Sequence, residues 1–282
     1  MRSLLISATL LFAATAAAQD LEVRAVKADL TKGDPAAAFW ATVPEVNVSL
    51  IGQPMVVPRP STTTTSNLKV KAVHDGKRIA FRLQWADPEK SEAGPLGKFS
   101  DAAAIQFPAM VAEFPPPVMM GAKGAPVHLF HWRAQYQRDR EVGKPTVKDL
   151  YPNGSIDIYP MEFPNPEATQ GLTARDQEKF SPATAEGNPQ AYTKTGVDEI
   201  IAEGFSTSQV MEGHSSSATG VWKDGAWSLV ISRPLAIEGG STLKVGGKSW
   251  AAFAVWQGGQ GEVGSRKCLT MAWSTLLLKE GP

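Results

Sequence analysis

Apolar and polar side chains alternate along two neighbouring stretches of the chain, residues 68–73 and 79–85. Such alternation places every second side chain on the same face and is typical of a half-buried β-strand. Asp75-Gly76 lies between the two stretches, and this dipeptide tolerates the positive φ angles that a tight hairpin turn requires. The pattern therefore predicts an antiparallel hairpin.

The same arrangement returns nearer the carboxyl end. A second hairpin is expected over residues 221–231, around Asp224-Gly225, and two more strands at 250–256 and 269–278. Many short strands with turn signals between them are typical of packed antiparallel sheets. We therefore predict a mainly β fold, an antiparallel β-sandwich.

Residues 137–195 differ from the rest because they are polar, interrupted by prolines and without a clear apolar period. A loop of this length without a core of its own is usually functional or part of a docking surface. We expect one β-sandwich domain, residues 19–282, with residues 137–195 as a loop insertion that covers part of it as a lid.

The first 18 residues have the features of an export signal. Arg2 supplies the positive start, residues 4–14 are largely apolar, and residues 16–18 are alanines suited to a cleavage point. The apolar run is shorter than the roughly 20 residues that cross a bilayer. We therefore predict a signal peptide over residues 1–18, a mature chain without a membrane span, and a periplasmic location.

Composition and charge then remove several classes of function. The 28 Lys and Arg residues balance the 28 Asp and Glu residues, and a chain without excess positive charge is not expected to bind nucleic acid. Cys268 is the single cysteine, which excludes an internal disulfide, a cysteine-ligated iron–sulfur cluster and covalent attachment of a c-type haem. The motifs of serine hydrolases, zinc proteases, phosphate loops and dinucleotide-binding folds are absent, so nothing indicates an autonomous enzyme.

Two histidines, His128 and His131, stand three positions apart beside Phe130 and Trp132. A helix would place both on one face, but the aromatic neighbours favour a strand, in which residues three apart point to opposite faces. We therefore favour structural histidines over a metal pair. A copper site built from both histidines and Met120 is the alternative.

Met119 and Met120 follow three prolines and precede a glycine. A stiff segment can present a thioether with little loss of freedom, and thioethers are soft ligands that suit haem iron and copper, although methionine is far more often a core residue. Lys267 precedes an apolar segment. Desolvation there would free a neutral nitrogen donor, whereas an exposed position would make it a solvated lysine at a strand edge.

Taken together, these segments resemble the haem b-binding gamma subunit of the periplasmic type II dimethyl sulfoxide reductase group of molybdoenzymes. That group includes ethylbenzene dehydrogenase, dimethyl sulfide dehydrogenase, selenate reductase and chlorate reductase. The residues that carry the resemblance lie, in order, at 73–88, 99–108, Met120-Gly121, Pro126-Val127, Trp132, 253–256 and 264–273.

The resemblance implies a sandwich that holds one haem b non-covalently between a methionine and a lysine, which here would be Met120 and Lys267. Met119 is the alternative methionine and His214 the alternative nitrogen ligand. The resemblance also implies a non-catalytic subunit that works beside a molybdopterin-containing catalytic subunit. Such a subunit would relay electrons between an iron–sulfur subunit and a soluble periplasmic carrier such as a c-type cytochrome.

An exported carbohydrate-binding β-sandwich module without haem is the alternative from another functional class. Many exported sandwiches bind sugars through exposed aromatic side chains, and this chain contains eight tryptophans. Several of them alternate with apolar neighbours and are expected to be buried, which counts against this alternative.

Overall fold

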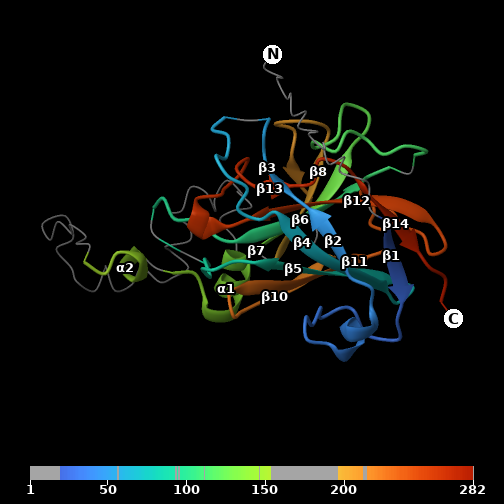
Figure 1. Ribbon diagram of the computed structural model, residues 1–282, viewed down its shortest axis with the longest axis horizontal. Helices are drawn as coiled ribbons and strands as arrows, with labels where there is room; N and C mark the ends of the chain where they lie inside the picture. Colours follow the sequence, from blue (N-terminus) through green and yellow to red (C-terminus); the bar gives the residue numbers. More distant parts are fainter. Residues whose placement is uncertain are drawn as a thin grey trace, which may run out of the picture.

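The fold is seen in a computed structural model, which describes residues 20–281 apart from 56, 93, 95, 111, 146, 154–195 and 212–214. Strands dominate this part of the chain (Figure 1). The strands are β1 (Asp20–Ala25), β2 (Val46–Ser49), β3 (Ile51–Gly52), β4 (Asn67–His74), β5 (Arg78–Ala86), β6 (Ala102–Pro108), β7 (Val127–Arg133), β8 (Val197–Ala202), β9 (Gln209–Val210), β10 (Ser217–Lys223), β11 (Ala226–Pro234), β12 (Lys248–Trp256), β13 (Cys268–Leu269) and β14 (Ser274–Leu278). The helices are α1 (Ala134–Val142), α2 (Val147–Leu150) and the short 3₁₀ helices Ala38–Thr42 and Gly258–Gln260.

Both predicted hairpins are confirmed. β4 and β5 pair in antiparallel register, with Val70 opposite Leu83. β10 and β11 pair in the same way, and their turn residues Asp224 and Gly225 have φ angles of 52° and 75°. Two consecutive positive φ angles give the turn the twist that matches the flanking strands.

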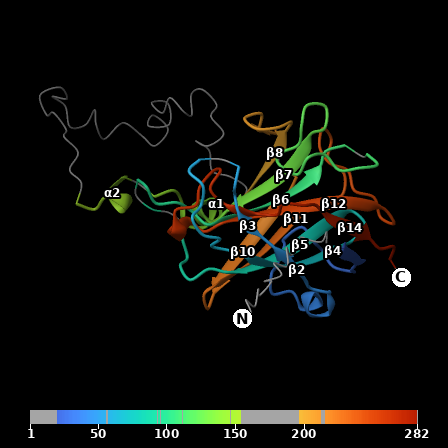
Figure 2. The ribbon, with the colours of Figure 1, turned by 45° about the horizontal axis from the view of Figure 1, so that its top comes forward.

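The strands form two layers that share β12. One layer runs in the order β10-β11-β5-β4-β1-β14, and the other in the order β12-β6-β7-β8-β9. Residues 248–251 of β12 pair with β14, while residues 252–256 pair with β6, so this strand passes from one layer to the other. In Figure 2, β6, β7 and β8 lie above β12, and β2, β4 and β5 lie below it.

The predicted mainly β fold is confirmed, and its first strand departs from the antiparallel pairing. β1 is parallel to both of its neighbours, β14 and β4, whereas the other described strand pairs are antiparallel. Hairpins impose antiparallel pairing on consecutive strands. β1 is inserted between strands from distant parts of the chain, so no hairpin determines its direction.

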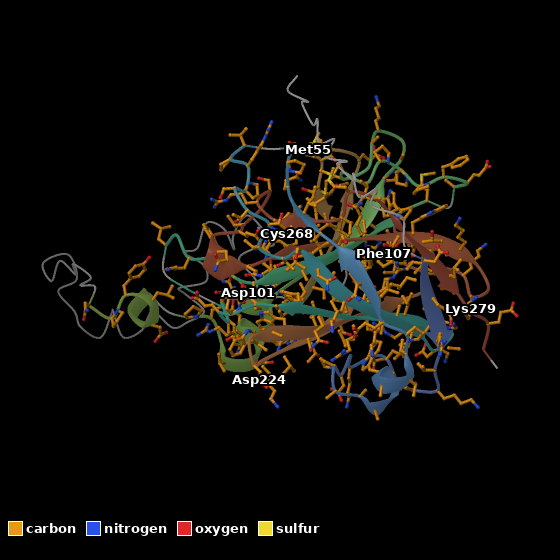
Figure 3. All side chains as sticks on the ribbon, viewed as in Figure 1. Met55, Asp101, Phe107, Asp224, Cys268 and Lys279 are labelled. Atoms are coloured by element: carbon orange, nitrogen blue, oxygen red, sulfur yellow. The ribbon has the colours of Figure 1, made fainter. Side chains whose placement is uncertain are left out.

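Aromatic side chains fill the space between the two layers. The ring of Phe107 in β6 lies 5.6 Å from that of Phe81 in β5, and the ring of Trp132 in β7 lies 5.1 Å from that of Trp227 in β11, between centroids. All four side chains are at most 1% exposed. Burial of one such ring stabilises the fold by about 2 kcal/mol. Figure 3 places Phe107 amid this packing and Asp224 at the outer edge.

The start of the predicted insertion is helical rather than a loop. α1 contacts the sandwich through Gln137, whose Nε2 donates to the carbonyl oxygen of Gly220 at 2.9 Å and whose Oε1 accepts from the Gly220 N–H at 2.7 Å. Beyond α1 and α2, most of the insertion falls on residues 154–195, which lie outside the described residues, as does the predicted signal peptide. Within the described ranges, no helix has the length and apolar character needed to cross a membrane.

Candidate functional site

Two adjoining cavities, of about 290 and 250 Å³, lie on the outer face of β6, β7 and β12. The strands alternate there. Ala104, Leu129 and Ala254 line a cavity, whereas their neighbours Ile105 and Phe130 belong to the core between the layers. We call the two cavities together the cleft, because they share the lining residues Ala104, Met120, Leu129, Ser208, Trp256, Gly264 and Lys267. Each approaches the lower end of the roughly 300–1,000 Å³ of small-molecule sites.

The methionine segment forms one wall of the cleft. Met119 lines the first cavity and Met120 lines both. The backbone is held in a compact turn, because the N–H of Gly121 donates to the carbonyl oxygen of Pro117 at 3.0 Å and the N–H of Gly204 donates to that of Met120 at 2.8 Å. The turn therefore fixes where the two thioethers lie.

The backbone at Met120 is strained. Its φ angle is +67°, a region that residues other than glycine, asparagine and aspartate rarely adopt, and strain of this kind is concentrated at functional sites. The next residue must be glycine, because Gly121 has a φ of +74° and a Cβ there would stand 2.6 Å from the carbonyl oxygen of Ala125. Tight packing around this turn thus holds Met120 in place.

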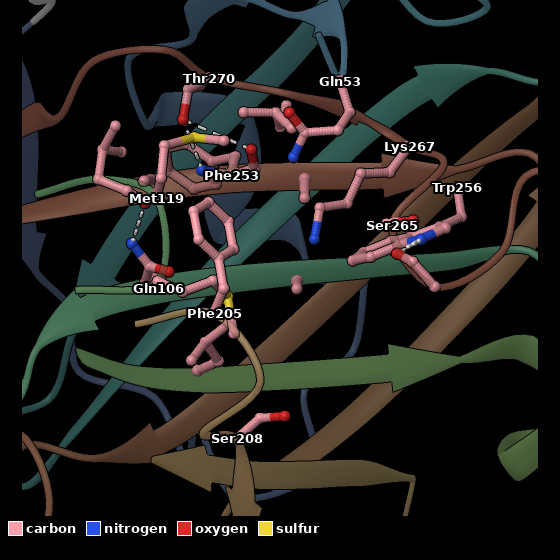
Figure 4. A pocket seen from close by; sticks show the side chains of 18 of the residues that line it. Gln53, Gln106, Met119, Phe205, Ser208, Phe253, Trp256, Ser265, Lys267 and Thr270 are labelled. Carbon is pink, nitrogen blue, oxygen red and sulfur yellow. Dashed lines mark hydrogen bonds between the residues drawn. The ribbon is translucent and has the colours of Figure 1, made fainter. Parts of the chain in front are cut away.

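Lys267 projects into the cleft from the opposite side, just before β13. Its carbonyl oxygen accepts a hydrogen bond from the N–H of Gln53 at 2.9 Å, which fixes the backbone. In Figure 4 its amine points into the space beside Met119, Phe205 and Ser265. This lysine and the two methionines are far apart along the chain, and the fold brings them together in one cleft.

The Lys267 amine has no polar partner within the described part of the chain. Its Nζ lies 4.8 Å from the centroid of the Trp256 ring. The side chain is half-buried, and burial lowers its pKa from 10.5 to about 8. A lysine in this state loses its proton far more readily than a solvated one, and the neutral amine has a lone pair for a metal.

The two neighbouring histidines lie on opposite faces of β7, as predicted. His131 faces the cleft, with its ring centroid 4.9 Å from that of Trp256. His128 faces the core, where its Nδ1 accepts from the Ser241 N–H at 3.0 Å. The alternative prediction of a copper site built from both histidines and Met120 is therefore wrong. Across the described residues, no group of three or more His, Cys, Asp or Glu side chains could hold a metal ion.

His214, the alternative nitrogen ligand, lies outside the described residues. The prediction for this residue therefore stays untested, and so does the choice between Met119 and Met120 as the ligand. Both methionines and Lys267 share one cavity, which is the condition that any pairing of them must meet.

Several residues that line the cleft were not predicted from the sequence to do so. The walls contain Trp256 and Phe205, and Phe205 is 54% exposed at the rim. A signal for the cleft was present in the alternation of β6 and β12, where the outer face carries small side chains. These are Ala102, Ala104, Ala252 and Ala254, which leave space above the sheet.

The cleft fits a haem in its donor chemistry. Two thioethers and an amine with a lowered pKa face one space whose walls are largely apolar, and sulfur and nitrogen donors are the usual axial ligands of haem iron. The tryptophans fit the sugar-binding alternative less well. Three of the eight, Trp85, Trp132 and Trp227, are at most 2% exposed, and none of the other five is fully exposed.

Known proteins resemble this chain over most of its length. Residues 37–268 match the family model described as ethylbenzene dehydrogenase. A protein of Haloferax mediterranei, named a putative respiratory nitrate reductase heme subunit, is 24% identical over 94% of this chain and 75% of its own length. The dimethylsulfide dehydrogenase subunit gamma of Rhodovulum sulfidophilum is 24% identical over 86% of this chain and 74% of its own.

One solved structure shows a distant likeness to this chain. It is named a putative carbohydrate-binding protein from Bacteroides uniformis, is 8% identical, and covers 94% of this chain and 100% of its own with a TM-score of 0.46.

Proposed function

The chain belongs to the ethylbenzene dehydrogenase family, and from this premise we propose that it is the electron-transferring haem b subunit of a periplasmic molybdoenzyme complex. The observation that carries the proposal is the cleft, in which the methionine turn and the amine of Lys267, which has no polar partner among the described residues, face one cavity. A relative named as a heme subunit supports it.

Met120 and Lys267 are the proposed axial ligands. Met120 is preferred over Met119 because it lines both halves of the cleft and sits in the strained turn. Lys267 is preferred over other nitrogen donors because burial lowers its pKa to about 8 without a partner to hold its proton. His214 remains the alternative nitrogen ligand, and Met119 the alternative sulfur ligand.

The chain's own residues provide the conditions for electron transfer. Haem b, when bound, supplies a one-electron redox couple. Met120 and Lys267 would both bind the iron, which would leave no position for a substrate, so the subunit would turn nothing over by itself. Trp256, Phe253 and Leu269 line the cavity with apolar surface, which excludes water and tunes the redox potential.

The partners follow from this role. An electron relay of this kind needs an electron donor and an electron acceptor. We assign these roles to an iron–sulfur subunit, which connects to a molybdopterin-containing catalytic subunit, and to a soluble periplasmic carrier such as a c-type cytochrome. The dehydrogenase gamma subunit found among the relatives supports an assembly of several chains.

The ligand assignment is tested by titrating the purified protein with haem and recording its visible spectrum. The wild type should give a low-spin b-type spectrum with split bands on reduction. Met120→Leu and Lys267→Leu should each lose the low-spin spectrum and bind haem about tenfold more weakly or worse, because one iron ligand is removed. Met119→Leu should keep both properties.

Two substitutions away from the cleft serve as controls. Met110 is 59% exposed and Lys223 lies exposed at the end of β10, so Met110→Leu and Lys223→Leu should behave as the wild type. If Met119→Leu loses the low-spin spectrum and Met120→Leu keeps it, the ligand is Met119. If the wild type stays colourless when supplied with haem, the proposed function is wrong and a sugar-binding role becomes the better candidate.

A further inference from the structure

The two halves of the cleft differ in charge. The first cavity is lined by uncharged side chains apart from Lys267, including Val118, Phe205 and Leu269. The second cavity is also lined by Lys98 and Arg133. Apart from Lys267, which lines both halves, the basic side chains are thus concentrated at one end of the cleft.

A third cation lies beside the basic end of the cleft. The guanidinium of Arg266 lies 5.7 Å from the ring centroid of Phe99, and Phe99 itself lines the second cavity. Helix α1 begins directly after Arg133 and has no acidic residue in its first turn, so the positive end of its dipole adds to the same region.

These cations lack anionic partners among the described residues. The recorded contact of the Arg133 guanidinium is with the Tyr136 ring, 5.2 Å from its centroid. Within the same part of the chain, Lys98 and Arg266 form no ion pair, and no side chain hydrogen bond is found for Arg133. A half-buried cation without a partner is costly, so the arrangement favours an anion in the cavity.

The carboxylate that lines this half of the cleft is already engaged. Glu262 accepts at Oε1 from the Thr64 hydroxyl at 2.8 Å and at Oε2 from the Gln257 N–H at 2.8 Å. It is 4% exposed and holds two loops together. Glu262 therefore does not supply the missing negative charge to Arg133.

We propose that the second cavity binds the two propionate carboxylates of the haem, with Arg133 as their main partner and Lys98 and Arg266 at the rim. This inference rests on the proposed function and adds the direction in which the porphyrin lies. Its carboxylate edge faces the beginning of β6 and α1, and its apolar body occupies the first cavity. Arginine suits this role because its planar donors match a carboxylate in two parallel hydrogen bonds.

The test compares haem with its dimethyl ester, which keeps the iron and the porphyrin but has no carboxylate charge. Each is titrated into the full-length protein, and affinity and spectrum are recorded. The wild type should bind haem about tenfold more tightly than the ester or better, since a hydrogen bond to a charged group contributes on that order. Arg133→Gln should reduce this ratio towards one while the ester still gives the low-spin spectrum.

Arg24→Gln is the matched control, because Arg24 is exposed on β1 and pairs with Glu22 outside the cleft. The ratio of the affinities of Arg24→Gln for haem and for the ester should equal that of the wild type. Arg133→Lys keeps the charge but not the planar donors, so it should retain part of the preference for haem over the ester. A low-spin spectrum of this variant would show that the fold and the iron ligands are intact.

The outcomes separate this inference from the proposed function. If the wild type binds haem and ester equally well with low-spin spectra, or if Arg133→Gln keeps the wild-type ratio, the propionate assignment is wrong while haem binding stands. If the wild type binds neither compound, the proposed function fails and the propionate site fails with it.

Discussion

Two cations that are shielded from solvent to different degrees, the buried Arg233 and the half-buried Lys267, differ in how their charge is compensated. Arg233 is 1% exposed in the core. Its Nε donates to the carbonyl oxygen of Pro234 at 2.7 Å, and its Nη2 donates to those of Leu235 at 2.9 Å and Ser241 at 2.7 Å. Burial lowers its pKa to about 9 although the charge of Glu199 opposes this, so it stays charged at neutral pH.

Lys267 has none of these compensations. Within the described chain its amine contacts the Trp256 ring and otherwise faces the cavity. Burial alone thus does not mark a site, because Arg233 is the more buried of the two. What distinguishes Lys267 is that its polar group is left without a partner beside a space large enough for a ligand. The predictions below test whether Arg233 is structural and Lys267 is not.

The largest effect is expected from Arg233→Met. The substitution removes the Arg233 donor to the carbonyl oxygen of Ser241, removes one of the two donors to the carbonyl oxygen of Leu235, and removes a buried positive charge that interacts with Glu199. A hydrogen bond from a charged group contributes about 1.5–3 kcal/mol, so the loss of several should lower the free energy of unfolding by about 3–5 kcal/mol. Urea unfolding of the haem-free protein measures this, and Arg24→Met on the exposed part of β1 should change it by less than about 0.5 kcal/mol. A loss of under about 1 kcal/mol would show that the network is not structural.

A smaller effect is expected from Glu199→Gln. Burial raises the pKa of Glu199, but the hydrogen bonds from Ser216 and Ser215 outweigh this and lower it below 4.5. The glutamine keeps an oxygen for the Ser216 N–H, which donates to Oε1 at 2.8 Å, but it loses the negative charge. We expect a loss of about 1–3 kcal/mol at pH 7, as for a weakened charged hydrogen-bond network.

The pH dependence of stability checks the same residue. A carboxyl group with a lowered pKa stabilises the fold above its unfolded pKa of 4.5, and this contribution is lost as the pH falls further, because the unfolded chain binds the proton first. The wild type should therefore lose more stability than Glu199→Gln between about pH 5 and pH 3. Glu238→Gln, at an exposed position, is the control, and identical profiles for all three proteins would contradict the role of Glu199.

The sequence was most informative where local chemistry decides the structure. Asp224-Gly225 fixes a turn because few other residues tolerate its φ angles of 52° and 75°. The alternation along β7 likewise places His128 and His131 on opposite faces. These features depend on neighbouring residues, so a single sequence contains them.

Features that depend on distant residues could not be read in the same way. The helix α1 lacks an apolar stripe and is held by Gln137 against the backbone of Gly220 in β10. The partnership of Arg233 with Ser241 and Glu199 has no sequence motif. Met120 and Lys267 were named from a family resemblance, and their meeting at one cleft is a property of the folded chain.

The smallest effect on stability is expected from Lys267→Leu in the haem-free protein. Because the amine has no polar partner to lose in the part of the chain that the structure describes, the free energy of unfolding at pH 7 should be unchanged or higher by at most about 1 kcal/mol, a modest value since the side chain is half-buried and still reached by solvent. The pKa of Lys267 lies near 8 in the fold against 10.5 in the unfolded chain. Between these values the unfolded chain binds more protons, so the stability of the wild type should rise with pH. The leucine variant should lack this rise, whereas Lys223→Leu should retain it.

A Lys267→Leu variant that loses several kcal/mol, as Arg233→Met should, would show that both cations are structural and that the difference between them is not a mark of function.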